Sequence, residues 1–159
     1  MSTPLYTAEQ RRRRDETRWT VVQGVIAPAQ FLAFLVSLVL VLRALLTGEG
    51  MAAAAASVVV KTLFLYAIML TGSLWEKAVF DRFLFARPFF WEDVFSMAVL
   101  ALHTAYLVAL GTGWMEGRGQ LLLALAAFAA YVINAGQFLL KLRAARLEGT
   151  AAPVLEVVR

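Results

Sequence analysis

Four long apolar stretches, separated by short polar or glycine-containing segments, dominate the pattern along the chain. A helix that crosses the hydrocarbon core of a bilayer needs about 20 mostly apolar residues. The stretches reach this length over residues 19–42, 52–75, 90–110 and 120–140. The pattern therefore predicts an all-α integral membrane protein, with one membrane domain over residues 1–159 that is a bundle of four transmembrane helices.

The basic residues predict how this bundle is oriented, because Lys and Arg gather in cytoplasmic loops. One side of the membrane would carry most of them, namely Arg11, Arg12, Arg13, Arg14, Arg18, Lys77, Arg82, Arg87, Lys141, Arg143, Arg146 and Arg159. The other side would carry only Arg43 and Arg118. We therefore expect both termini in the cytoplasm, as short basic tails over residues 1–18 and 141–159.

Composition excludes several kinds of protein and site. The chain is 61% hydrophobic and 16% charged, whereas about a quarter of the residues in a soluble domain are charged. The chain has no cysteine, which excludes disulfides, thiolate metal sites and Cys nucleophiles. Its net charge of +4 comes from residues at the ends of apolar stretches, which indicates membrane topology rather than nucleic-acid binding. The sequence contains no phosphate-binding loop, nucleotide fingerprint, Ser-His-Asp set or metal-ligand cluster.

The cytoplasmic segment 77–89 mixes rings with charges. It contains Phe80, Asp81, Arg82, Phe83, Phe85, Arg87 and Phe89. Such a segment is expected to lie in the headgroup region, with its rings toward lipid and its charges toward water. Two interpretations stay open. We favour an aromatic anchor, because interfacial aromatic residues are common; the other is an entrance for a flat, amphipathic substrate.

Each predicted helix carries one stripe of polar residues at helical spacing. The stripes are Gln23, Gln30 and Ser37; Thr62, Tyr66, Ser73 and Glu76; Glu92, Ser96, His103 and Tyr106; and Tyr131, Asn134, Gln137 and Lys141. Four such stripes would converge in the interior of the bundle. They would serve either as hydrogen bonds between helices or as the lining of a polar site.

Three carboxylates are the sharpest candidates for chemistry. Glu76 ends the second span while Glu92 and Asp93 begin the third, so the hairpin brings all three to one level. The helix dipole favours acids at a helix N-terminus and disfavours them at a C-terminus, which makes Glu76 the more informative residue. Its structural alternative is a surface ion pair with Lys77 or Arg82. A partly desolvated carboxyl group keeps its proton and can act as an acid, whereas a better solvated one remains an anionic base.

Two basic residues are predicted near the middle of the membrane. At a rise of 1.5 Å per residue, His103 lies roughly 12 Å and Lys61 roughly 13 Å from the outer ends of their spans. A charged Lys at that depth costs about 2.5–3.5 kcal/mol, so ionisable residues there are functional candidates. A lone His cannot build a zinc site, but neutral imidazole is a good axial ligand for a metal in a macrocycle. The structural alternative for His103 is a hydrogen bond to Gln30 or Tyr106.

Three blocks of the sequence carry a family resemblance. They are the run 66–106, which contains WEK, FFWED and ALHTAY, the opening MSTPLYTAEQRRRRD and the closing YVINAGQFLLKLRAAR. Together they resemble the 3-vinyl bacteriochlorophyllide hydratases of anoxygenic phototrophs; only the tail after Arg146 departs from the pattern. The resemblance implies hydration of the C3 vinyl group of chlorophyllide a, or of 3-vinyl bacteriochlorophyllide a, to 1-hydroxyethyl in bacteriochlorophyll a biosynthesis. It implies no cofactor beyond the magnesium in the substrate, and it brings no catalytic residues with it.

We assign roles to this chain's residues from the chemistry of hydration. Glu92 is predicted as the acid that protonates the vinyl group, and Glu76 or Asp93 as the base that activates water. His103 is predicted as the axial ligand of the substrate's magnesium. The predicted substrate-binding residues are His103, Tyr106, Gln30, Lys61, Asn134, Arg82 and Arg87, the last two, or Lys77, receiving the propionate. Glu92 and His103 lie roughly 16 Å apart along their helix, so a chlorin must lie along that helix to touch both.

Two functions of other classes remain open. The first is a non-catalytic tetrapyrrole carrier or photosystem assembly factor, and the second is a small exporter that uses Lys61 as its titratable group. The expected location is the cytoplasmic (inner) membrane or an intracytoplasmic photosynthetic membrane. The expected partners are the pigment, the lipid bilayer and other enzymes of the same pathway, with no nucleic acid.

Overall fold

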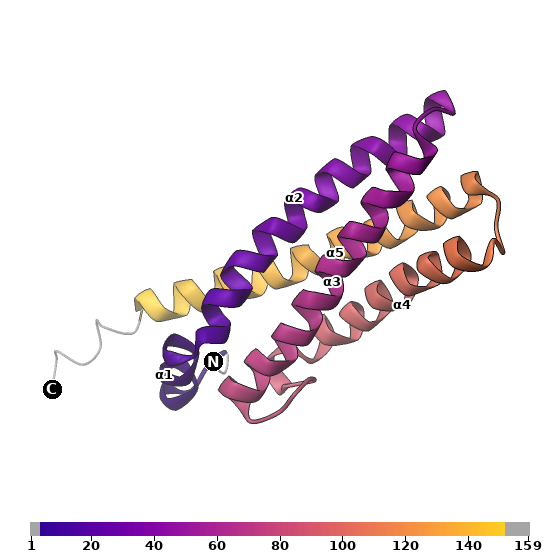
Figure 1. The fold of residues 1–159 in the computed structure, drawn as a ribbon. Helices are drawn as coiled ribbons and strands as arrows, with labels where there is room; N and C mark the ends of the chain where they lie inside the picture. The colour runs from indigo at the N-terminus through magenta and orange to yellow at the C-terminus, as the bar shows by residue number, and fades with distance from the viewer. Residues whose placement is uncertain (1–3, 152–159) are drawn as a thin grey trace, which may run out of the picture.

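The computed structural model describes residues 4–151, with side chains through Glu148, as helices joined by short turns (Figure 1). In chain order these are α1 (Ala8–Glu16), α2 (Arg18–Thr47), α3 (Met51–Phe80), the 3₁₀ turn η1 (Arg87–Phe89), α4 (Phe90–Thr112) and α5 (Gly117–Ala151). The part of the chain described contains no strand, which confirms the all-α prediction. Residues 1–3 and 152–159, including the predicted cytoplasmic Arg159, lie outside the described residues.

Within the described residues, four helices are long and apolar enough to cross a membrane, over 18–47, 51–80, 87–112 and 117–148. Only 22–33% of their most apolar windows is buried, so most of these side chains face outward, as lipid-facing surfaces do. The prediction of a multi-pass membrane protein with four spanning helices is confirmed. Each predicted span lies inside one of these helices, and α3 continues into the predicted loop as far as Phe80.

The ends of the helices follow from local chemistry. Thr7 precedes α1 and forms a capping box with Gln10, in which each backbone N–H donates to the other's side chain. These bonds satisfy donors that have no partner inside the helix. Gly48 ends α2 with φ 75° and Gly113 ends α4 with φ 65°. Glycine adopts this left-handed conformation without steric cost, which explains why both helices stop at these residues.

The four long helices form two antiparallel hairpins, α2 with α3 and α4 with α5 (Figure 1). Polar side chains link the first hairpin: the Ser37 and Ser57 hydroxyls lie 2.9 Å apart, and Gln23 Nε2 donates to Thr71 Oγ1 at 2.6 Å. In lipid such bonds hold helices together. The polar stripe predicted for the first span therefore serves, at Gln23 and Ser37, as hydrogen bonding between helices.

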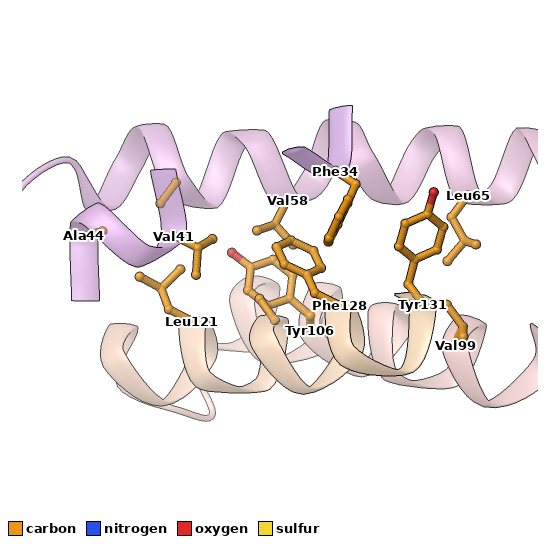
Figure 2. Close-up of a cluster of buried hydrophobic side chains, with 12 residues drawn as sticks. Phe34, Val41, Ala44, Val58, Leu65, Val99, Tyr106, Leu121, Phe128 and Tyr131 are labelled. Atoms are coloured by element: carbon orange, nitrogen blue, oxygen red, sulfur yellow. The ribbon is translucent and has the colours of Figure 1, made fainter. Parts of the chain in front are cut away.

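A layer of rings joins the two hairpins in the middle of the bundle (Figure 2). The ring of Phe34 on α2 meets Phe128 on α5 edge-on at 5.5 Å and Tyr131 at 5.1 Å, measured between ring centroids. Buried Val58 and Leu121 pack into the same cluster. Lipid tails are as apolar as these side chains, so close packing rather than the hydrophobic effect holds the hairpins together.

One end of the bundle gathers α1, the α3–α4 loop and the C-terminal part of α5, while the α2–α3 and α4–α5 turns lie at the other end (Figure 1). The N-terminal segment is tied to α5, because the backbone N–H of Leu5 donates to Glu148 Oε2 at 3.0 Å. The described residues predicted to be cytoplasmic therefore share one end of the molecule. Which side of the membrane that end faces stays a prediction.

Replacing Phe34 by Ala should lower the free energy of unfolding, measured in detergent, by about 2 kcal/mol. This is the part of the loss that comes from the cavity left behind by the ring. The control is Phe31→Ala, because Phe31 is the same residue type on the same helix but 49% exposed. We expect the control to cost less than half as much. Equal losses in the two variants would contradict the placement of Phe34 between the hairpins.

Candidate active site

Glu76, Glu92 and Asp93 lie together at the end of the bundle where the α3–α4 loop returns. All three are buried, with exposures of 5%, 7% and 3%. The carboxyl groups of Glu76 and Asp93 are close enough to interact with each other. An ionised carboxylate can only accept hydrogen bonds, so a hydrogen bond between the two needs a proton on one of them. The hairpin thus places a carboxyl pair, rather than separate surface acids, inside the protein.

The same two carboxyl groups hold the α3–α4 loop. The backbone N–H of Phe85 donates to Asp93 Oδ2 at 2.8 Å, and that of Ala86 donates to Glu76 Oε2 at 3.1 Å. Phe85 has a φ of 60°, a left-handed conformation that few residues other than glycine adopt. The bonds from two successive N–H groups therefore stabilise a loop shape that its backbone does not prefer.

Glu92 has different partners. Its Oε1 lies 3.2 Å from Nζ of Lys141 on α5, and Lys141 also donates to the carbonyl of Pro88. Within the described residues, Glu92 Oε2 is buried without a hydrogen-bond partner. Glu92 is therefore placed as an anion beside a cation, with one oxygen left to accept a hydrogen bond.

Asn134 and Ser96 connect α5 to α4 beside this group. Asn134 Nδ2 donates to the backbone carbonyl of Glu92 at 2.9 Å, and Ser96 Oγ donates to Asn134 Oδ1 at 3.1 Å. Both side chains are buried. Asn134 was predicted to bind substrate; in the structure its amide is used to fix the position of Glu92.

The basic residues of the loop stay on the surface. Lys77 Nζ donates to Asp81 Oδ1 at 2.7 Å, and this hydrogen bond and its charge hold the pKa of Asp81 below the usual range. Arg82 Nη1 donates to the carbonyl of Phe85 at 3.4 Å, and Arg87 is exposed. Since Lys77 and Arg82 have these other partners, the structural alternative of a surface ion pair for Glu76 is not found.

His103 lies in the middle of the bundle and is fully buried. Its Nδ1 is 2.8 Å from the carbonyl of Val99. A carbonyl only accepts, so Nδ1 carries the proton and Nε2 keeps its lone pair. Nε2 has no hydrogen-bond partner within the described residues. The structural alternative of a bond from His103 to Gln30 or Tyr106 is therefore not found, and Nε2 retains the lone pair that a metal ligand needs.

Lys61 forms the other half of this central cluster. Its side chain is fully buried, and its Nζ lies 3.9 Å from the centroid of the Tyr131 ring. Among the described residues, neither Lys61 Nζ nor the hydroxyl of Tyr106 has a hydrogen-bond partner. Lys61 is close enough to His103 for the two to interact electrostatically, and Gln30 is 2% exposed. The predicted site residues thus fall into an end cluster around the carboxyl groups and a central cluster around Lys61 and His103.

The carboxyl groups are closed off from the outside in this structure. Two apolar grooves lie on the surface of the bundle: one of about 490 Å³ runs along α4 past Ala101 and Thr104, and one of about 450 Å³ lies between α2 and α3 past Ala33 and Val60. No predicted site residue lines either groove. A substrate therefore reaches the end cluster only if some covering segment moves.

The sequence did not point to Tyr6, Trp75 or Phe138, which pack with Phe80 and Phe89 directly beside the end cluster. Tyr6 is 4% exposed although it stands in a polar, basic tail. The sequence shows only that Tyr6 is an aromatic residue directly before the N-cap of a helix. That position does not predict which other side chains its ring contacts. Among the described residues, no group of three His, Cys, Asp or Glu side chains is suited to hold a metal ion.

Comparison with known proteins shows the family to which the chain belongs. The family model described as 2-vinyl bacteriochlorophyllide hydratase matches residues 6–144. A 2-vinyl bacteriochlorophyllide hydratase of Cereibacter sphaeroides is 66% identical over 148 residues, which cover 93% of this chain and 92% of the relative. The chain belongs to the 2-vinyl bacteriochlorophyllide hydratase family. A second member, from Rhodobacter capsulatus, is 63% identical over 147 residues, or 92% of this chain and 85% of the relative. No solved structure matches.

Membership of the hydratase family confirms the resemblance seen in the sequence. The matched region, 6–144, runs from Tyr6 past Lys141, so it contains both the end cluster and the central cluster. The family name describes a hydratase, which is a hydro-lyase, and adding water to a double bond is acid–base chemistry. Of the two clusters, only the end cluster contains carboxyl groups, the type of group that such chemistry uses.

Replacing Lys61 by Met should raise the free energy of unfolding in detergent by about 1–3 kcal/mol, because a buried polar group without a partner costs about that much. Met keeps the length of the side chain without the amine. The control is Lys77→Met on the surface, for which we expect a change within about 0.5 kcal/mol. A clear loss of stability in the Lys61 variant would mean that its contact with Tyr131 outweighs the cost of burial.

Proposed function

We propose that this protein adds water to the C3 vinyl group of chlorophyllide a or 3-vinyl bacteriochlorophyllide a and forms the 1-hydroxyethyl group of bacteriochlorophyll biosynthesis. The two relatives carry the name 2-vinyl bacteriochlorophyllide hydratase; 2-vinyl and 3-vinyl denote the same substituent under two numbering schemes for the ring. The observation that carries the proposal within the structure is the buried contact between Glu76 and Asp93 beside Glu92.

The first step is the transfer of a proton to the terminal carbon of the vinyl group. The donor is a proton shared by Glu76 and Asp93, whose buried carboxyl groups interact with each other. The electron pair of the C=C bond forms the new C–H bond. The carbon next to the ring becomes a cation, and the conjugated macrocycle delocalises its charge.

The second step is the attack of water on that cation. Glu92 accepts a proton from the attacking water through Oε2, the oxygen without a partner among the described residues. The pair has then lost one proton and Glu92 has gained one, so a proton returns from Glu92 to the pair before the next cycle. The sum is the addition of H₂O to C=C, which transfers no electrons, and we propose that no redox cofactor takes part.

These roles exchange the acid and the base predicted from the sequence. Glu92 was predicted as the acid, but its ion pair with Lys141 at 3.2 Å supports the ionised form, which suits a base. Glu76 and Asp93 were predicted as candidate bases, and the proton that a hydrogen bond between them needs suits an acid. The three carboxyl groups stay the same; only the direction of proton transfer changes.

Binding of the pigment involves both clusters. The free lone pair of His103 Nε2 supports a role as axial ligand of the magnesium that the substrate carries. We assign the buried residues Gln30, Lys61 and Tyr106 to substrate binding beside it. Roughly 16 Å separates Glu92 from His103 along α4, so this role requires the chlorin to lie along the helix. Unchanged pigment binding in His103→Ala would remove it. We assign the propionate to exposed Arg82 and Arg87.

The end cluster faces the cytoplasm in this proposal. Helix α1, the α3–α4 loop and the C-terminal part of α5, which carry most of the basic residues, share its end of the bundle, and the positive-inside rule favours the cytoplasm for that end. The membrane is then the cytoplasmic membrane or its intracytoplasmic extension, where other enzymes of the pathway would deliver and receive the pigment.

Single amide substitutions test the carboxyl mechanism. Glu76→Gln, Asp93→Asn and Glu92→Gln should each lower the rate of hydration of chlorophyllide a by about 100-fold or more, the usual contribution of an acid or base. The assay uses the purified protein and mass spectrometry of the pigment, which gains one water on hydration. The control is Asp81→Asn, an exposed carboxylate on the same loop, and it should keep the full rate.

Full activity in all three amide variants would contradict the mechanism. A pigment that is bound tightly but unchanged in mass by the unaltered protein would favour a non-catalytic carrier. Absence of both binding and hydration, together with transport that depends on Lys61, would favour an exporter. The same incubation therefore separates the proposed function from both alternatives.

A further inference from the structure

Lys141 of α5 reaches across to the start of α4. Its Nζ lies 3.2 Å from Oε1 of Glu92, donates to the backbone carbonyl of Pro88 and lies 5.9 Å from the centroid of the Phe89 ring. The side chain of Lys141 is 30% exposed, whereas that of Glu92 is 9% exposed. Surface ion pairs contribute little to stability, but removing the cation from a buried pair leaves a buried charge without a partner. Glu92 therefore depends on Lys141 more than a surface carboxylate would.

A cation is unexpected at this place in the fold. Helix α4 begins at Phe90, and the partial charge at a helix N-terminus is positive, so it attracts anions and disfavours cations. A neutral donor could satisfy the carbonyl of Pro88. Of the two hydrogen-bonding partners of Lys141, only the carboxylate of Glu92 is a charged group that gains from a cation. The positive charge of Lys141 is therefore explained by Glu92 and not by the fold of the loop.

Helix α5 holds both the main chain and the side chain of Glu92. Asn134 Nδ2 donates to the backbone carbonyl of Glu92 at 2.9 Å. Lys141 follows Asn134 after about two helical turns and therefore lies on the same face of α5. Lys141 takes Oε1 of Glu92, while Oε2 has no hydrogen-bond partner within the described residues. The two contacts from α5 thus fix which oxygen of Glu92 stays available.

The three buried carboxyl groups differ in what surrounds them. Among the described residues, an ion pair is found for Glu92 but for neither Glu76 nor Asp93. Glu92 also interacts electrostatically with Asp93 on its own helix. Without Lys141 it would be a desolvated carboxyl group beside another acid, and both conditions favour uptake of a proton. The charge of Lys141 is therefore what sets Glu92 apart from the other two.

We propose that Lys141 is a positioning residue for the addition of water: its ammonium group holds Oε1 of Glu92, keeps that carboxyl group ionised and leaves Oε2 to meet the water. The role of Glu92 as the base rests on the proposed function, whereas the hold of Lys141 on Glu92 rests on the contacts alone. Lys141 touches neither the pigment nor the reacting atoms in this proposal. It acts only through Glu92.

Hydration of chlorophyllide a by the purified full chain is the first measurement. Lys141→Met keeps the length of the side chain without its charge. Because Lys141 acts on the base and not on the substrate, kcat should fall by about tenfold or more while KM stays the same. Lys141→Arg restores a cation that binds carboxylates, so it should recover most of kcat. The matched control is Arg143→Met, which removes an exposed cation from the same helix and should keep the full rate.

Infrared spectroscopy at neutral pH is the second measurement, and it needs no activity. The C=O band of protonated carboxyl groups should be stronger in Lys141→Met than in the unaltered protein, because Glu92 takes up a proton when its cation is gone. Adding Glu92→Gln to Lys141→Met should remove this increase, and Lys141→Arg should not show it. A merely structural role, in which Lys141 only ties α5 to the carbonyl of Pro88, predicts no increase that depends on Glu92, and that result would overturn the proposal. If Lys141→Met does not fold, Lys141→Gln, which keeps a donor without the charge, decides by the same two measurements.

The two proposals fail in distinguishable ways. Hydration of chlorophyllide a by the unaltered protein tests the function alone, and the infrared band in the Lys141 variants tests the hold on Glu92 alone. If hydration is absent while the band grows in Lys141→Met and not in Lys141→Arg, the hold on Glu92 stands and the function falls. If hydration occurs while kcat or the band does not respond to Lys141→Met, the function stands and the role of Lys141 falls.

Discussion

The hydrogen bonds from Phe85 and Ala86 to Asp93 and Glu76 are the constraint on which the end of the bundle depends. They fold the α3–α4 loop back over the carboxyl groups and keep those groups out of water. In our proposal the two desolvated carboxyl groups, Glu76 and Asp93, also share one proton. One set of contacts therefore shapes the loop, joins the two hairpins and buries the carboxyl groups to which we assign the proton transfers.

The structure separates two kinds of polar residue that the bilayer treats alike. Side chains such as Gln23 and Ser37 form hydrogen bonds with a neighbouring helix. This is how polar groups in lipid usually find a partner. Glu92, His103 and Lys61 each keep an atom without a partner within the described residues. Burial of an unpartnered polar atom costs free energy, so these residues are the strongest candidates for a functional role.

The sequence was sufficient to predict the helices, because the length of each apolar stretch determines them. It was also sufficient to predict that Glu76, Glu92 and Asp93 lie together, because one hairpin joins the ends of the two helices that carry them. It was not sufficient for the partners of those residues. The pairing of Lys141 with Glu92 depends on how α5 slides against α4, and helical periodicity does not fix that register. The burial of Tyr6 depends on a tail folding back onto three other elements, which no local pattern encodes. The sequence alone could not show the ion pair between Lys141 and Glu92, which is why the acid and base that we now propose differ from those assigned from the sequence.

Infrared spectroscopy of the purified protein tests the shared proton most directly, because a protonated carboxyl group has a C=O stretching band that a carboxylate lacks. We predict such a band at neutral pH, lost in Glu76→Gln and in Asp93→Asn and retained in Glu92→Gln. A spectrum without a protonated carboxyl band, or with one that disappears only in Glu92→Gln, would contradict the carboxyl pair as the proton donor.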